Sequence, residues 1–268
     1  MDIALFSPSS LFSEEDDIPT NDENSDTQEI YVERKHQFPG MELIIREFSF
    51  HQLNANLLWP GTFAFAEWLV QHRSYIEGRR AIELGRQLSS LHILDFFFLP
   101  HVAFLSNFSG TGALAIFLLK TYNLDITTSD YEDQEIEDNI AHNCRANEIP
   151  VIPHIKHTWG DKFPNSVPDW DLIIANVKQY ANLIQTISFL LKCYKPGDRK
   201  ALSRTRDDEN AVGDVVLPWP AFLMSWRRRI GKEDELLFFN GCENAGLKVQ
   251  HIGSRVYCVV LKGNESND

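Results

Sequence analysis

Apolar positions along the chain recur with two different spacings, and their alternation predicts strands followed by helices. Short apolar runs typical of buried strands occupy 80–85, 124–130, 151–159, 170–176 and 221–226. Helical spacing occupies 62–70, 113–120, 136–144, 178–195 and 233–245. This order of segments predicts an α/β fold built on an open, mostly parallel sheet.

Antiparallel signals flank this pattern on both sides. Apolar side chains in 42–48 indicate strands of an N-terminal extension, with order beginning near residue 31. Segments 248–252 and 255–261 surround a turn at 253–254 and predict a β-hairpin. Dehydrogenases with a dinucleotide-binding sheet usually continue with parallel strands and a substrate domain, so the hairpin argues against that class.

The first 30 residues differ in composition from the rest. They hold nine acidic side chains and no Lys or Arg, which predicts a disordered tail acting as a solubilising leader rather than as an electrostatic lure for substrate. The chain has 268 residues, 43% of them hydrophobic, enough for one sizeable core. Residues 31–268 are therefore expected to form one domain.

The formal net charge of −13 argues against a nucleic-acid partner, because phosphate binding needs a concentrated basic surface. Basic protein substrates suit this charge better. A membrane partner is not expected, since the apolar stretch 91–105 is too short to span a bilayer and contains Asp95 and Pro100. No basic segment opens the chain, so we expect a cytoplasmic location, with the nucleus as an alternative. The sequence does not indicate an oligomeric state.

The four cysteines are widely spaced and form no Cys-x-x-Cys pair. This spacing argues against both a zinc site and a disulfide framework. We interpret all of them as packing residues. They are Cys144, Cys193, Cys242 and Cys258.

A candidate nucleotide-binding turn follows the strand 80–85, but it is split. The strand ends in Glu83 and Gly85, and the carboxyl ends of parallel strands face the ligand crevice. The glycine-rich turn expected next is found only at Ser109-Gly110-Thr111-Gly112. Removing residues 86–108 makes the strand, the turn and the next helix continuous.

The same excision corrects a second distance. It reduces the separation between Gly85 and Asp130 from 45 to 22 residues, near the roughly 20 expected between such a turn and the acid that binds a ribose. We therefore hypothesise that 86–108 is an insertion, from retained non-coding sequence or a variant exon.

Four residues near predicted strand or helix ends are candidates for ligand contact. Asp130 ends the second strand of the sheet, where a carboxylate can accept both ribose hydroxyls. Trp159 and Ala175 come at the ends of the next two strands, and Trp59 precedes the first helix. Position alone favours a core role for the two tryptophans over ligand contact.

Five motifs carry a resemblance to a known family. They are Leu58-Trp59-Pro60-Gly61, Glu83-Leu84-Gly85 with Ser109-Gly110-Thr111-Gly112, Thr128-Ser129-Asp130, Thr158-Trp159-Gly160, and the strand 170–176. With these motifs the chain, from about Phe48 to Leu261, resembles the seven-β-strand protein-lysine methyltransferases of the methyltransferase-like group, especially its plant members. The resemblance implies a Rossmann-like seven-stranded sheet, mostly parallel, with a C-terminal antiparallel hairpin.

The resemblance also implies S-adenosylmethionine as cofactor, no metal, and a lysine side chain of a protein as methyl acceptor. The residues implied to contact the cofactor are Trp59, Gly85, Ser109, Gly110, Asp130, Trp159 and Ala175. Trp159 is expected beside the adenine, and the backbone around Gly110 near the methionine part. The implied reaction is an in-line attack of a neutral amine on the sulfonium methyl, for which the protein supplies alignment and desolvation.

One departure from the family concerns the end of the fourth strand. Family members carry an acid and then an aromatic residue there, as D-x-x-Y or D-x-x-F, whereas this chain has Asn176 and, later, Tyr180. An amide can accept a hydrogen bond but carries no charge. Two hypotheses remain: an active methyltransferase in which 86–108 loops out, or a non-catalytic binding or regulatory variant of the fold. A hydride-transferring enzyme is a distant third.

Overall fold

The computed structural model describes residues 31–49, 58, 60–85, 110–176, 181–197, 217–225 and 232–263. The predicted acidic tail 1–30 and the proposed insertion 86–108 lie outside the described residues.

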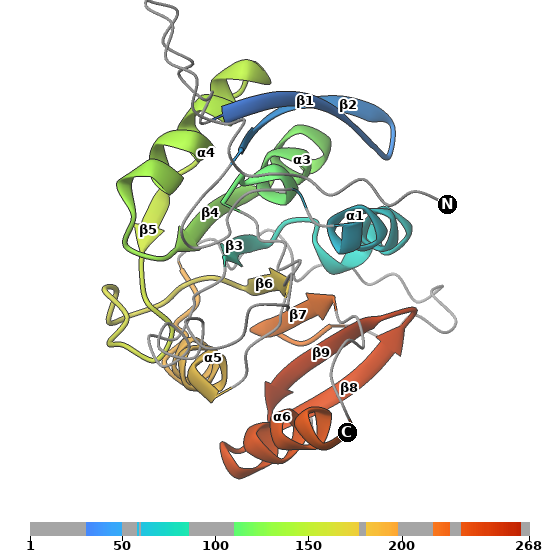
Figure 1. Cartoon of the computed structure of the whole chain (residues 1–268). Helices are drawn as coiled ribbons and strands as arrows, with labels where there is room; N and C mark the ends of the chain where they lie inside the picture. The colour runs from blue at the N-terminus through green and yellow to red at the C-terminus, as the bar shows by residue number, and fades with distance from the viewer. Residues whose placement is uncertain are drawn as a thin grey trace, which may run out of the picture.

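A seven-stranded sheet organises the fold, in the order β5-β4-β3-β6-β7-β9-β8 (Figure 1). Its strands are β3 (Arg80–Leu84), β4 (Asp125–Asp130), β5 (His154–Lys156), β6 (Leu172–Asn176), β7 (Ala221–Ser225), β8 (Leu247–Gly253) and β9 (Val256–Leu261). The first five are mutually parallel, whereas β9 runs antiparallel to both β7 and β8. The predicted fold class is confirmed, including the C-terminal hairpin.

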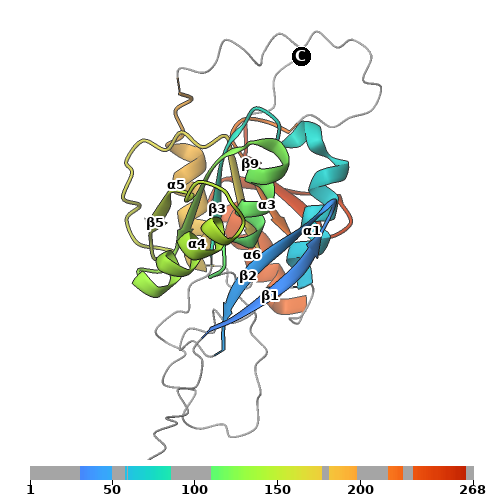
Figure 2. The ribbon, with the colours of Figure 1, turned by 90° about the horizontal axis from the view of Figure 1, so that it is seen from above.

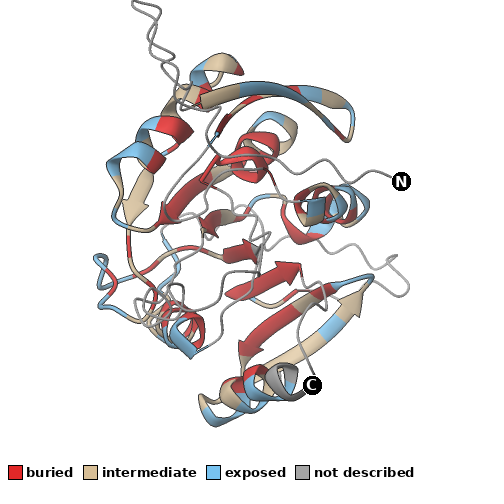
Figure 3. Cartoon of the chain, viewed as in Figure 1, coloured by how far each residue is buried: buried red, intermediate tan, exposed pale blue. Residues whose placement is uncertain are grey.

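Helices cover both faces of this sheet. They are α1 (Pro60–Gln71), η2 (Arg73–Tyr75), α3 (Ala113–Tyr122), α4 (Gln134–Ala146), α5 (Ala181–Lys192) and α6 (Lys232–Asn244). Side chains alternate along β3, so that Ala81 joins a core with α1, α3 and α4, while Ile82 joins a second core with α5 and α6. Figure 3 shows buried residues concentrated in the strands and on the inward faces of the helices.

A separate two-stranded hairpin, β1 (Tyr31–Phe38) and β2 (Met41–Phe48), forms the N-terminal extension that the sequence predicts. It packs against α1, α3 and α4 (Figure 2). Leu43 and Ile45 of β2 are fully buried. The hairpin therefore forms a further layer outside α1, α3 and α4 on one side of the sheet.

Two predicted elements differ in length from the observed ones. The strand predicted at 151–159 is reduced to His154–Lys156. Its first residues are lost where Pro153 lacks the N–H that a ladder needs. The helix predicted at 178–195 is observed as Ala181–Lys192, with residues 177–180 outside the described residues. The other predicted strands and helices agree within two residues where they are described.

Cysteine packing follows the prediction for three of the four residues. Cys144, Cys242 and Cys258 are buried, and Cys193 is half-buried. Within the described ranges, no helix is long and apolar enough to cross a membrane. The same residues contain no group of three or more His, Cys, Asp or Glu side chains suited to holding a metal ion.

Arg79 anchors the segment that enters β7. The residue is 4% exposed, and its guanidinium donates to the carbonyl oxygens of Leu217 at 2.6 Å and Pro218 at 2.9 Å. It also lies 4.5 Å from the ring centroid of Trp219. Burial lowers the pKa of Arg79 to about 10, so the side chain stays charged at neutral pH.

We expect Arg79→Met to lower the free energy of unfolding by about 3 kcal/mol, because it leaves two carbonyl oxygens without their charged donor. Urea unfolding at neutral pH measures the loss. The control is Arg73→Met, which breaks an exposed ion pair with Glu77 and should cost less than about 1 kcal/mol. Equal losses in the two variants would contradict an anchoring role for Arg79.

Candidate functional site

The carboxyl ends of three adjacent parallel strands form the candidate site. Leu84 of β3 is paired with Ser129 of β4 on one side and with Ala175 of β6 on the other. Gly85 directly follows β3, and its N–H donates to the carbonyl oxygen of Ser129 at 2.6 Å. This register brings Gly85, Asp130 and Ala175, three of the predicted cofactor contacts, to one edge of the sheet.

Gly85 is required by the close approach of Asp130. A Cβ built at Gly85 would overlap the carboxylate of Asp130, whose Oδ2 and Cγ are its nearest atoms. Any side chain at this position would displace the acid. Gly85 and Asp130, each predicted as a cofactor contact, are therefore in direct contact with each other.

Asp130 is a desolvated carboxylate. It is 4% exposed, and its Oδ1 accepts from the backbone N–H of Tyr131 at 2.8 Å. Burial raises the pKa of Asp130 well above its usual range, and the nearby charge of Glu83 raises it further. A group in this state gains from hydroxyl donors, which stabilise its charged form.

Glu83 lies behind the crevice and connects β3 to α3. Its carboxyl is 5% exposed, and Oε2 accepts from the backbone N–H of Ala115 at 3.0 Å, in the first turn of α3. Burial raises the pKa of Glu83 to about 7, against the lowering effect of that hydrogen bond. The acid satisfies a helix N-terminal donor, which fits the helix dipole.

The glycine loop enters α3 from the same side. Gly110 and Thr111 are buried, and Gly112 adopts a left-handed conformation at φ 65° as the N-cap of α3. A Cβ at Gly112 would lie 3.0 Å from Cγ2 of Ile140 on α4. The loop is thus held closely against α4.

Trp159 lies in a turn after β5 and is 2% exposed. It belongs to the apolar cluster that contains Leu84 and Ala175. Its segment is tied to the crevice, since the N–H of His157 donates to the carbonyl oxygen of Asp130 at 2.8 Å. Trp159 therefore lies beside the strand ends that form the site, and its predicted contact with adenine remains a prediction.

Several predicted site residues lie outside the described residues. They are Trp59, Ser109 and Tyr180. The backbone of Asn176 ends β6 opposite Ser225 of β7, but its side chain is not described. The predicted roles of these positions stay predictions.

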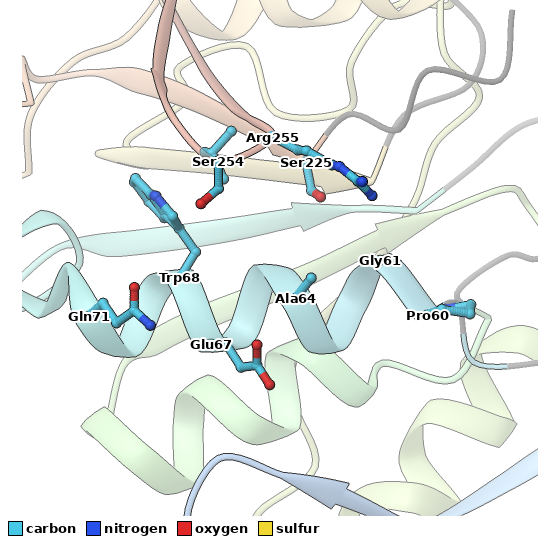
Figure 4. A pocket seen from close by; sticks show the side chains of 10 residues that line it. Pro60, Gly61, Ala64, Glu67, Trp68, Gln71, Ser225, Ser254 and Arg255 are labelled. Atoms are coloured by element: carbon cyan, nitrogen blue, oxygen red, sulfur yellow. The ribbon is translucent and has the colours of Figure 1, made fainter.

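A groove lies between α1 and the end of β7, with the turn that joins β8 and β9 as its other wall (Figure 4). Its volume is about 310 Å³. Glu67 and Gln71 line it from α1, Ser225 from β7, and Ser254 and Arg255 from the turn. Because Ser225 is paired with Asn176, the groove opens at the same sheet edge as the crevice.

Two buried asparagines of α4 and a third at its C-cap have no role predicted from the sequence. Asn139, Asn143 and Asn147 lie at i, i+4 and i+8, and each is at most 5% exposed. Polar residues with this spacing form one helix face. The sequence contains this pattern, since each asparagine follows one of the predicted apolar positions 136, 140 and 144 by three residues.

No protein-family model matches the chain. Among curated proteins, it is similar to the histone-arginine methyltransferase METTL23 of Xenopus laevis, with 20% identity over 169 residues. The match covers 60% of this chain and 62% of that relative, so the similarity spans less than two thirds of the relative's length.

Three solved methyltransferase structures are similar to this chain, all at low sequence identity. The 16S rRNA N2 methyltransferase RsmC of T. thermophilus, in complex with AdoMet and guanosine, matches with a TM-score of 0.47 and 12% identity over 86% of this chain and 50% of that one. The ribosomal protein L11 methylase of Lactobacillus delbrueckii matches with a TM-score of 0.42 and 14% identity, over 72% of this chain and 73% of that one. A methyltransferase of Pyrococcus furiosus matches with a TM-score of 0.44 and 12% identity, over 75% of this chain and 83% of that one.

Proposed function

We propose that this protein is an S-adenosylmethionine-dependent methyltransferase. The observation that carries the proposal is the contact between Gly85 and the buried Asp130 beside the loop 110–112, at the carboxyl edge of the sheet. Open α/β sheets bind nucleotide-containing ligands at this edge. The similarity to METTL23 supports the same class of activity.

The residues present fit this cofactor. Asp130 would accept the ribose hydroxyls, because its desolvated carboxylate is stabilised by such donors. Gly85 leaves room for that acid, and the buried backbone of Gly110 would lie along the methionine part. When bound, the cofactor supplies a methyl group activated by a sulfonium charge. The chain's own residues bind it, orient it and keep water away.

A nitrogen of a protein side chain is the proposed methyl acceptor, with lysine first. The motifs shared with protein-lysine methyltransferases and the net charge of −13, which suits basic partners, support this choice. Arginine is the second candidate, because the curated relative is named as a histone-arginine methyltransferase. An amine must be neutral to attack, and Asn176 offers no carboxylate to help at the end of β6.

The first test is calorimetric titration of S-adenosylmethionine into the full chain and into a chain lacking residues 86–108. We expect both to bind with comparable affinity if 86–108 is accommodated without disturbing Gly85 and the glycine loop. Binding by the shortened chain alone would support the non-catalytic alternative for the full chain. Absence of binding in both would refute the cofactor site proposed here.

The acceptor is tested by incubating the protein with basic proteins and an isotope-labelled methyl donor, followed by mass spectrometry. Label on lysine supports the first choice, and label on arginine supports the second. Asp130→Ala, which removes the proposed ribose contact, is the matched control and should abolish the label. Label retained in that variant would contradict catalysis at this site.

A further inference from the structure

The asparagine face of α4 joins two segments that are far apart in sequence. On one side lies strand β2 of the N-terminal hairpin, and on the other lies the glycine loop of the proposed cofactor site. All three asparagines are nearly or fully buried, so each of their hydrogen bonds replaces contact with water. Asn139 and Asn143 each contact both segments.

Asn143 holds strand and loop together. Its Oδ1 accepts from the N–H of Arg46 at 2.7 Å, and its Nδ2 donates to the carbonyl oxygen of Arg46 at 3.1 Å. The same Nδ2 donates to the carbonyl oxygen of Thr111 at 3.0 Å. One amide group thus satisfies both backbone groups of a β2 residue and one of the loop.

Asn139 repeats this arrangement one turn earlier. Its Nδ2 donates to the carbonyl oxygen of Arg46 at 3.1 Å and to that of Gly110 at 3.0 Å. Its Oδ1 accepts from Nε of Arg46 at 2.8 Å. The carbonyl oxygens of two successive loop residues, Gly110 and Thr111, are therefore fixed by side chains that also hold β2.

Asn147 provides an internal comparison. It binds β2 as Asn143 does, since Oδ1 accepts from the N–H of Ile44 at 3.1 Å and Nδ2 donates to the carbonyl oxygen of Ile44 at 2.6 Å. Its third bond, however, goes to the carbonyl oxygen of Asn143 within α4 at 2.8 Å. Asn143 and Asn147 therefore differ in whether they contact the glycine loop.

The next residue of β2 reaches another segment beside the site. Glu47 is 1% exposed, and its Oε1 accepts from the backbone N–H of Leu58 at 2.8 Å, two residues before α1 begins. Its Oε2 pairs with Arg34 of β1 at 2.8 Å. Two successive residues of β2 therefore make contacts near the site: Arg46 binds the asparagines that hold the glycine loop, and Glu47 binds the backbone just before α1.

We propose that the β1–β2 hairpin is a positioning element of the cofactor crevice, acting on the glycine loop through Asn139 and Asn143. The amides orient the carbonyl oxygens of Gly110 and Thr111 toward α4, so that the loop keeps one conformation before a ligand arrives. Preorganisation of this kind raises affinity by reducing the ordering that binding requires. The effect on the cofactor rests on the function proposed above, whereas the effect on the loop does not.

The test compares Asn139→Leu, Asn143→Leu and the matched control Asn147→Leu in the full chain. Leucine has a similar volume but cannot donate or accept, and each variant loses two hydrogen bonds to β2. Amide hydrogen exchange of Gly110 to Gly112 is measured first, under conditions where local opening controls exchange. We expect the first two variants to accelerate exchange by about tenfold or more, and the control to change it by less than about threefold.

Affinity for S-adenosylmethionine is the second readout, with an expected weakening of about tenfold in Asn139→Leu and Asn143→Leu only. If the unchanged protein binds no S-adenosylmethionine, the proposed function fails, and amide exchange alone decides the positioning role. Equal acceleration of loop exchange in all three variants would overturn the proposal, because it would reflect general destabilisation. Unchanged loop exchange in all three would overturn it as well.

Discussion

Raising the pH from about 4.5 to about 7 is expected to cost the folded protein on the order of 3 kcal/mol through Glu83, and the Glu83→Gln variant should escape this loss. The carboxyl of Glu83 is 5% exposed within β3. Burial raises its pKa from 4.5 to about 7. A carboxyl with a raised pKa binds its proton more tightly in the folded than in the unfolded protein.

The sign of the effect follows from that difference. Below pH 4.5 both states carry the proton, and the stability it confers is fully present. As the pH rises through about 7, the folded state must bury a charge that the unfolded state exposes to water, and this stability is lost. Asp130, whose pKa burial also raises, changes stability in the same direction.

Urea unfolding at pH 5 and pH 8 measures the loss in three proteins. Glutamine at position 83 keeps an acceptor for the N–H of Ala115, so Glu83→Gln removes the charge without removing the hydrogen bond. The control is Glu67→Gln, which makes the same change in net charge at an exposed position of α1. We expect the pH dependence to shrink in the first variant only. A wild-type pH dependence in Glu83→Gln would show that another group carries it.

Much of the fold could be predicted from periodicity, because the sheet is buried on both faces. The strand predicted at 170–176 contains a continuous apolar run, Leu172–Ala175, and the turn at 253–254 separates two alternating segments. The parallel register then follows from the alternation of strands and helices. It places Gly85 beside Asp130.

The asparagine bridge could not be predicted with the same rules. Its bonds to β2 join residues about 100 positions apart, such as Asn143 and Arg46, and no local pattern encodes that pairing. Asparagine is also disfavoured in helix interiors, so its presence on α4 suggests surface rather than core. The sequence shows three asparagines at helical spacing beside an apolar stripe. Their role is apparent only from the hydrogen bonds that they make with the packed hairpin.

The Gly85→Ala variant is expected to lose affinity for S-adenosylmethionine by about 100-fold or more. The added methyl group would overlap the carboxylate of Asp130. The acid must then leave the position from which it is proposed to accept two ribose hydroxyls, each a charge-assisted bond of about 1.5–3 kcal/mol. The control is Gly197→Ala, whose Cβ would meet only Oδ2 of Asp169, at 3.8 Å. Calorimetric titration of both variants tests the difference.

Measuring the free energy of unfolding separates the steric overlap between residue 85 and Asp130 from the loss of the proposed ribose contact. Overpacking should lower the free energy of unfolding of Gly85→Ala by about 1–3 kcal/mol. In the Asp130→Ala background the carboxylate is gone, so adding Gly85→Ala should cost little further free energy of unfolding. The affinity of the double variant for S-adenosylmethionine should stay low. If the glycine substitution costs the same with and without Asp130, its effect lies in the backbone of residue 85, and the contact between the two residues is not what requires the glycine.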